Sequence, residues 1–185
     1  MRVVLLDNRD SFVYNLVDQF ASSGASIEVY RNTLEAGRIL DAALERAIPT
    51  LGICLGFQAL VTACAGAVAR IGPVHGKSTR VELTEEGRAD PVFSPLREPL
   101  RVARYHSLGT RRLPAALIPL ARTPPEDPAG PGVVMAARHR RLPAIGLQFH
   151  PESLLTPQGP ALLKALAEEL ALSGAEAPRT RPGRS

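Results

Sequence analysis

Apolar residues in the first third of the chain come in short runs that alternate with amphipathic segments. Residues 2–6 form an apolar run, as expected of a parallel strand that is covered on both faces. Residues 12–21 and 33–44 repeat apolar positions at helical spacing, whereas residues 26–30 alternate as a strand does. Residues 49–51 are a further short apolar run. This strand–helix–strand–helix order predicts an α/β fold with an open, largely parallel, twisted sheet and helices on both faces.

The pattern changes after Gly66, where short strand candidates follow one another. These candidates are residues 68–71, 79–83, 100–104, 116–121, 133–137 and 144–149. They predict a small antiparallel β region in addition to the parallel strands. Residues 157–172 have the spacing of a closing amphipathic helix, so we expect one domain over residues 1–172.

Residues 173–185 hold three arginines against Glu176 alone, so two of the four net positive charges lie in this short segment. We expect it to be a disordered basic tail. The other arginines are dispersed, without the basic stripe of a nucleic-acid surface, and no apolar run is long enough to span a membrane. The sequence therefore predicts neither a nucleic-acid nor a membrane partner.

Length and cysteine content indicate the number of domains and the cellular compartment. The chain has 185 residues, of which 45% are hydrophobic, and this suits one globular domain with a sizeable core. The start enters an apolar run too abruptly for a signal peptide. Two cysteines make no disulfide framework and agree with a reducing compartment, so we expect a cytoplasmic protein. Cys64 lies among apolar residues and is expected to be a packed core thiol.

A glycine-framed cysteine follows the apolar run at residues 49–51. The segment reads Gly52, Ile, Cys54, Leu, Gly56, which is the cysteine form of a nucleophile elbow. In such an elbow a sharp strand-to-helix turn lifts one side chain above the sheet, and glycines on either side let strand and helix pass closely. The pattern predicts that Cys54 is a nucleophile.

A histidine and a carboxylate suited to serve that nucleophile occur far downstream. His150 and Glu152 are separated by one residue, so in an extended segment both side chains leave on the same side. A carboxylate placed in this way can orient the imidazole and stabilise its protonated form. The alternative is a small buried cysteine with an unrelated surface His-Pro-Glu segment. No group of residues has metal-ligand spacing and no Gly-rich phosphate loop follows a strand, so no metal and no cofactor is expected.

Five motifs in order carry a family resemblance. They are Leu-Asp-Asn-Arg-Asp-Ser-Phe at 6–12, Leu-Gly-Ile-Cys-Leu-Gly-Phe-Gln at 51–58, His-Gly-Lys-Ser at 75–78, Arg-Tyr-His-Ser-Leu at 104–108, and Gly-Leu-Gln-Phe-His-Pro-Glu-Ser at 146–153. In this order the chain resembles a class I glutamine amidotransferase with a flavodoxin-like fold. Within that family it is similar to the glutaminase subunit of anthranilate synthase or aminodeoxychorismate synthase. The early Asp-Asn-x-Asp-Ser-Phe favours these chorismate-using enzymes, whereas the tryptophan and folate branches both stay open.

The resemblance implies that the chain hydrolyses glutamine and delivers ammonia to a chorismate-binding synthase subunit. Cys54 would attack the amide carbon, His150 would move the proton, and the backbone N–H of Leu55 would stabilise the oxyanion. The remaining expected site residues are Gln58, Ser107 and Leu108 for substrate binding, and Arg9, Ser11, His75 and Lys77 for partner contact. His106 is a rival base, but it has no carboxylate neighbour in sequence and is expected to be a positioning residue.

One part of the family pattern is missing. Relatives carry a further strand that ends in a Ser-Pro-Gly-Pro-Gly loop, whose backbone N–H completes the oxyanion hole. In this chain the second strand region ends near Asn32, and the next helix already begins at Thr33. Either the protein is a genuine deletion form, or a segment has been omitted between these residues. Without this loop, one alternative function is a catalytically impaired docking subunit that keeps the fold and the partner surface. A stand-alone γ-glutamyl hydrolase is a further alternative.

Overall fold

The computed structural model describes residues 2–7, 13–22, 24, 26–31, 36–128 and 130–176. Its elements are β1 (Arg2–Asp7), α1 (Val13–Ser22), β2 (Ser26–Arg31), α2 (Ala36–Glu45), β3 (Thr50–Ile53), α3 (Leu55–Ala63), β4 (Ala69–Arg70), β5 (Lys77–Leu83), α4 (Glu85–Ala89), β6 (Leu100–Arg104), β7 (Leu108–Gly109), β8 (Leu117–Arg122), β9 (Val134–His139), β10 (Ala144–Leu147) and α5 (Gly159–Glu176). All the predicted helices and strands are present, with ends within four residues of the prediction. The two short elements α4 and β7 were not predicted.

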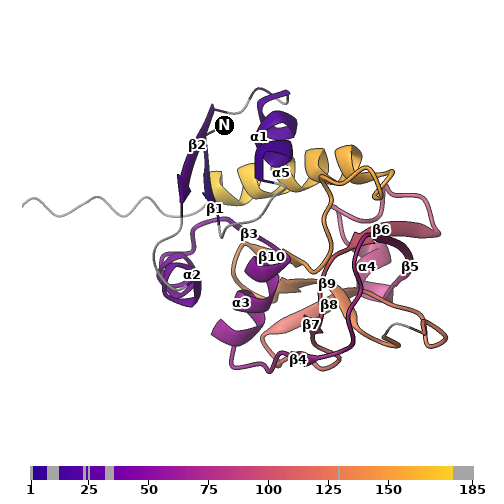
Figure 1. The fold of residues 1–185 in the computed structure, drawn as a ribbon. Helices are drawn as coiled ribbons and strands as arrows, with labels where there is room; N and C mark the ends of the chain where they lie inside the picture. Colours follow the sequence, from indigo (N-terminus) through magenta and orange to yellow (C-terminus); the bar gives the residue numbers. More distant parts are fainter. Residues whose placement is uncertain are drawn as a thin grey trace, which may run out of the picture.

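The largest sheet has six strands in the order β3-β10-β9-β8-β5-β6. Its β3–β10 pair is parallel, as is the separate pair β1–β2, whereas the other pairs of the six-stranded sheet are antiparallel. The strands β9 and β10 are joined by only four residues, and so short a connection permits only antiparallel pairing. The α/β class is confirmed, and the sheet that carries it is mixed, with the small antiparallel pair β4–β7 beside it (Figure 1).

Helices cover both faces of this sheet, as the sequence predicts. Neighbouring residues of β10 point in opposite directions, and Ala144 packs into a cluster with residues of α2 and α3, whereas Ile145 packs into the cluster that contains residues of α1 and α5. Gly146 faces the same side as Ala144, and a Cβ there would lie 2.4 Å from a ring carbon of Phe57. The missing side chain lets α3 pack closely against β10, and this sets the height of the elbow above the sheet.

The strands β1 and β2 stand apart from the six-stranded sheet (Figure 1). Among the described strands, β1 has no ladder with β3. Leu5 of β1 and Ile27 of β2 nevertheless pack against the same core cluster as Leu51 and Ile53 of β3. Side-chain packing therefore joins the two sheets where hydrogen bonds do not. Asn32 and Thr33, between which the strand of the family pattern is missing, lie outside the described residues.

The last helix, α5, ends later than predicted. α5 continues to Glu176, so residues 173–176 are helical and do not belong to a disordered tail. The hydroxyl of Ser173 donates to the carbonyl of Glu169 at 2.9 Å, which satisfies it within the helix. Residues 177–185 lie outside the described part of the chain.

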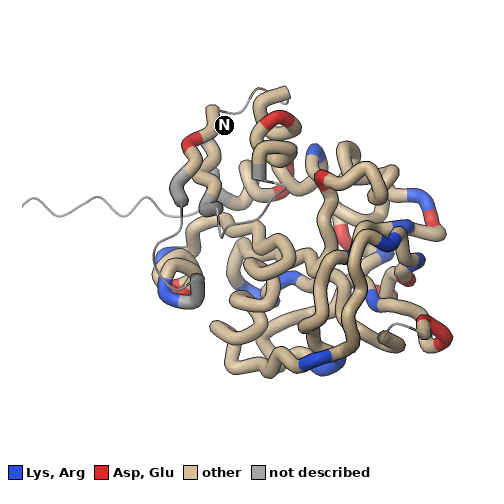
Figure 2. Tube along the Cα trace, in the orientation of Figure 1, with Lys and Arg blue, Asp and Glu red and all other residues tan. Residues whose placement is uncertain are grey.

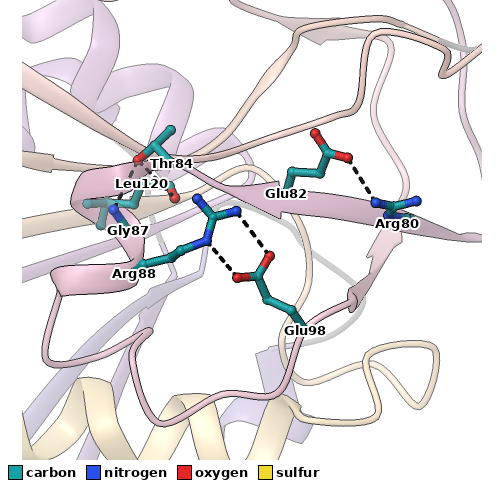
Figure 3. Close-up of polar contacts among 7 residues, drawn as sticks. All are labelled: Arg80, Glu82, Thr84, Gly87, Arg88, Glu98 and Leu120. Atoms are coloured by element: carbon teal, nitrogen blue, oxygen red, sulfur yellow. Dashed lines mark hydrogen bonds and ion pairs between the residues drawn. The ribbon is translucent and has the colours of Figure 1, made fainter.

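Charged residues are distributed over several elements, with Asp and Glu between the Lys and Arg residues (Figure 2). Figure 3 shows one such region, where Arg88 of α4 contacts Glu98 at 2.8 Å and Arg80 contacts Glu82 at 3.0 Å. These pairs are exposed and add little stability. The short helix α4 is held instead by Thr84, whose hydroxyl accepts from Gly87 N–H at 3.0 Å and donates to the carbonyl of Pro119 at 2.7 Å.

Gly87→Ala is expected to destabilise the protein by about 1–3 kcal/mol, because overpacking displaces backbone. A Cβ at Gly87 would lie 1.9 Å from the Leu120 carbonyl oxygen (Figure 3). The measurement is the midpoint of urea unfolding. Gly56→Ala is the matched control, since a Cβ there meets nothing within 4 Å and alanine favours a helix. Equal midpoints for the Gly87 variant and the unmodified protein would contradict this close approach.

Candidate active site

Cys54 lies at the junction between β3 and α3 in a strained backbone conformation. Its φ is 51° and its ψ is −98°, in a region that residues with a side chain rarely occupy. A Cβ at Gly52 would lie 2.6 Å from the carbonyl carbon of Gly56, so glycine is required there, as the elbow pattern predicts. At Gly56 a Cβ would meet open space, so the second glycine of the frame is not required by packing.

The segment after β10 brings His150 and Glu152 to this cysteine. Because β10 pairs with β3, the Cys54 N–H donates to the Leu147 carbonyl at 2.7 Å. The ring of His150 hydrogen-bonds the Cys54 side chain, and its Nδ1 lies 2.6 Å from Glu152 Oε1. Glu152 thus occupies one ring nitrogen and leaves Nε2 for the sulfur. All three side chains are buried, so water competes little for these contacts.

These contacts set the protonation of His150. Burial alone would lower the pKa of His150, but its hydrogen bonds to Cys54 and Glu152 and the negative charge at both positions raise the pKa to about 10. The ring therefore holds its proton at neutral pH when its partners are charged.

His106 has a different environment from His150. Its Nε2 accepts from Arg104 Nε at 3.3 Å, so its Nδ1 carries the hydrogen and donates to the Leu108 carbonyl at 2.9 Å. Burial and the nearby Arg104 charge lower the pKa of His106 to about 4. Both ring nitrogens are occupied, which agrees with a positioning residue rather than a base. Arg104 is itself fully buried and paired with Asp127 at 3.1 Å, a contact for which the sequence has no signal.

The expected substrate residues lie beside the elbow. Gln58 is one helical turn after Cys54, and its Nε2 donates to the Leu108 carbonyl at 3.2 Å. Ser107 is exposed next to Leu108. Leu55 is the first residue of α3, and the first N–H groups of a helix have no acceptor within the helix. No side chain caps this helix end, so the Leu55 N–H can donate to a bound group.

The expected partner residues are only partly described. His75 and Lys77 are exposed, and the His75 ring packs edge-on against Tyr105 at a centroid distance of 5.3 Å. Tyr105 in turn packs edge-on against His150 at 5.5 Å. A continuous set of rings therefore connects the surface at His75 to the site. Arg9 and Ser11 lie outside the described residues.

Gln148 is a site residue that sequence reasoning did not single out. It is fully buried beside Cys54. The sequence feature that could have indicated its role is a polar residue between the apolar residues Leu147 and Phe149. Among the described residues, no group of His, Cys, Asp and Glu side chains could hold a metal ion. In the same part of the chain, none of the helices has the length and apolar character to cross a membrane.

The chain matches the family described as glutamine amidotransferase class-I over residues 34–170. It belongs to this family. The match begins just after the position between Asn32 and Thr33, where the sequence lacks a strand of the family pattern. The cysteine elbow and the His-Pro-Glu segment both lie within the matched residues.

Curated relatives are similar over almost the whole chain. The anthranilate synthase component 2 of Corynebacterium glutamicum is 41% identical, over 91% of this chain and 97% of the relative. The protein of the same name from Haemophilus influenzae is 37% identical with the same coverage. The pyocyanine-specific component 2 of Pseudomonas aeruginosa is 39% identical over 89% of this chain and 92% of the relative.

The alignments also show that this amidotransferase is shorter than its relatives. The alignment with the Corynebacterium protein runs over 205 positions, whereas 91% of 185 residues is about 168. About 37 positions, the difference between these numbers, therefore have no counterpart in this chain. This supports the absence of a segment that relatives carry.

Solved structures establish the fold. A protein from Thermoplasma acidophilum, described as a GMP synthase subunit, superimposes with a TM-score of 0.78 at 18% identity, covering 93% of this chain and 94% of that chain. A glutamine amidotransferase from Thermotoga maritima has a TM-score of 0.69 at 18% identity, with coverage of 95% and 98%. The amidotransferase fold is therefore retained over nearly the whole chain.

Proposed function

We propose that this amidotransferase is the glutaminase subunit of a chorismate-using synthase, in which it hydrolyses glutamine and delivers ammonia to the synthase subunit. The observation that carries the proposal is the hydrogen-bonded arrangement of Cys54, His150 and Glu152 at a strained strand–helix junction. A nucleophile, a proton carrier and an orienting carboxylate are the groups that amide hydrolysis through a thioester requires.

In the proposed reaction the proton of the Cys54 thiol passes to His150 Nε2, and the Cys54 sulfur attacks the side-chain amide carbon of glutamine. His150 then protonates the departing nitrogen, ammonia leaves, and a γ-glutamyl thioester remains on the cysteine. Water attacks the thioester with His150 as base, which releases glutamate and restores the thiol. The Leu55 N–H donates to the oxyanion of each tetrahedral intermediate, and Gln58, Ser107 and Leu108 hold the substrate.

The partner is proposed to be a chorismate-binding subunit that covers the site. The relatives are named as second components, which supports a partner, and they are named for anthranilate synthase, which favours anthranilate over aminodeoxychorismate as the product. The exposed residues His75 and Lys77 lie on the side that leads to His150 through Tyr105. We place them at the interface, together with Arg9 and Ser11, in a cytoplasmic complex.

A catalytically impaired docking subunit is the second candidate. It is favoured by the lack of a hydrogen-bonded ladder between β1 and β3 among the described strands, and by the alignment positions of the relatives that have no counterpart in this chain. Loss of one oxyanion donor costs about a hundred- to a thousandfold in turnover. Glutamine hydrolysis measured with and without the synthase subunit separates the two candidates. Hydrolysis that rises with the partner supports the glutaminase, and partner binding without hydrolysis supports the docking subunit. Full hydrolysis without any partner effect would support a stand-alone hydrolase.

Lys77→Glu is expected to weaken binding to the synthase subunit by about tenfold at low ionic strength, and by less at high ionic strength, because interface charges act mainly through screened attraction. The measurement is the dissociation constant at two salt concentrations. Lys164→Glu is the matched control, since Lys164 is an exposed lysine on α5. Equal effects of the two substitutions would place Lys77 outside the interface.

A further inference from the structure

Gln148 is a fully buried amide that the proposed reaction does not use. It follows β10 directly, and its backbone N–H donates to the Met135 carbonyl at 2.9 Å, which fixes its main chain. Buried amides are almost always hydrogen-bonded, and the partners of this one come from the site. Its Nε2 lies 3.9 Å from Cys54 Sγ, and its Oε1 accepts from Gln58 Nε2 at 3.2 Å.

The direction of these hydrogen bonds is determined by the Leu108 carbonyl. A carbonyl oxygen can only accept, so Gln58 must present its Nε2 to Leu108. The same Nε2 is the atom that contacts the Gln148 amide, so Gln148 must present its oxygen to Gln58. The remaining Nε2 of Gln148 therefore faces the Cys54 sulfur as a donor.

Gln148 and His150 act on the sulfur from one segment. They are two residues apart, and both side chains hydrogen-bond the Cys54 side chain. The segment is anchored, since His150 N–H donates to the Ala103 carbonyl at 3.2 Å and Thr156 Oγ1 donates to the His150 carbonyl at 2.7 Å. Two side chains from one anchored segment thus contact one sulfur atom.

We propose that Gln148 is a positioning residue that holds Cys54 Sγ toward His150 by donating a hydrogen bond from Nε2, in an orientation set by Gln58 and the Leu108 carbonyl. The positioning role adds a residue to the proposed glutaminase site, and its importance for catalysis rests on that proposed function. The hydrogen bond restrains a nucleophile whose backbone is already strained. Because Gln58 hydrogen-bonds Gln148, a substrate that contacts Gln58 would also affect the position of the Cys54 sulfur.

The test is the rate at which iodoacetamide alkylates each cysteine, resolved by peptide mass spectrometry. Alkylation needs neither glutamine nor the partner, so this test stands even if the proposed function fails. Gln148→Met has similar volume but no donor, and we expect alkylation of Cys54 at neutral pH to fall about tenfold, as for loss of one hydrogen bond to a charged group. Cys64 is an internal reference because burial and the nearby Asp41 raise the pKa of its thiol, and its rate should not change.

Two further variants complete the test. Gln158→Met is the matched control, because its amide exchanges hydrogen bonds of 2.8 Å with the backbone of Arg97 and does not contact Cys54. Gln58→Met leaves Gln148 free to turn its amide, so Cys54 alkylation should fall here as well, by about two- to threefold. This variant decides the question if Gln148→Met does not fold, which a faster Cys64 reaction would reveal.

The turnover of glutamine supplies the second readout. For Gln148→Met we expect kcat to fall about tenfold while the KM for glutamine stays within about twofold, because Gln148 contacts the nucleophile and not the substrate. Unchanged Cys54 alkylation in the folded Gln148 variant would overturn the inference. An unmodified protein that alkylates as expected, yet never hydrolyses glutamine, would overturn the proposed function and leave the placement of Gln148 intact.

Discussion

Cys54→Ala is expected to abolish glutamine-dependent product formation while ammonia-dependent formation by the synthase subunit persists. The substitution removes the sulfur that would form the thioester, so the loss should reach the detection limit. The measurement is product formation by the complex with glutamine or with ammonium salts as the nitrogen source.

Cys64→Ala is the matched control for this substitution. Cys64 is half-buried on the far end of α3 and does not contact His150 or Glu152, so its removal should leave both activities in place. Loss of both activities in the Cys54 variant would mean that Cys54 serves folding or docking rather than chemistry.

Glu152→Gln is expected to lower the turnover of glutamine and to shift the alkaline limb of the kcat/KM profile, which reports the free protein, to lower pH. The hydrogen bond and the charge of Glu152 help to raise the pKa of His150 to about 10, so the protonated ring that donates to departing ammonia persists until the pH approaches that value. Removing the carboxylate charge lowers this pKa, and the protonated ring is then lost at a lower pH. Because general acid catalysis contributes about 10²–10⁴-fold, the loss at alkaline pH should be at least about tenfold.

The measurement is kcat/KM as a function of pH for both proteins, from initial rates at glutamine concentrations well below KM. Glu169→Gln is a suitable control, since Glu169 pairs with Arg138 on the sheet and lies outside the site. An unchanged alkaline limb in the Glu152 variant would show that another group protonates the leaving nitrogen.

The short form of this amidotransferase gives these measurements particular weight. The resemblance to the family implies a second oxyanion donor in a loop for which this sequence has no counterpart, and the chain is shorter than its aligned relatives. The Leu55 N–H at the start of α3 is the donor that we propose for the oxyanion. Turnover of the unmodified complex therefore tests whether glutamine is hydrolysed without that loop.

Local pattern was sufficient to predict most elements and the residues of the elbow. The spacing of apolar positions distinguishes a strand from a helix because the side-chain period is 2 in one and 3.6 in the other. Gly52 could be predicted to face a close backbone because the turn at Cys54 is encoded within a few residues. His150 and Glu152 are in contact, but residues 150–153 form a turn, in which the Ser153 N–H donates to the His150 carbonyl at 3.4 Å, and not the extended segment on which the prediction rested.

Only the tertiary structure determined the pairing of strands and the hydrogen bonds of buried polar groups. The sequence order of β3, β9 and β10 does not reveal that β10 lies between the other two, because the pairing of β10 with β3 joins segments that are far apart in the sequence. Neither the neutral state of His106 nor the role proposed for Gln148 has a local signal. Gln148 and Cys54 are 94 positions apart, and an amide acquires a direction only when folding has placed its donor and acceptor partners around it.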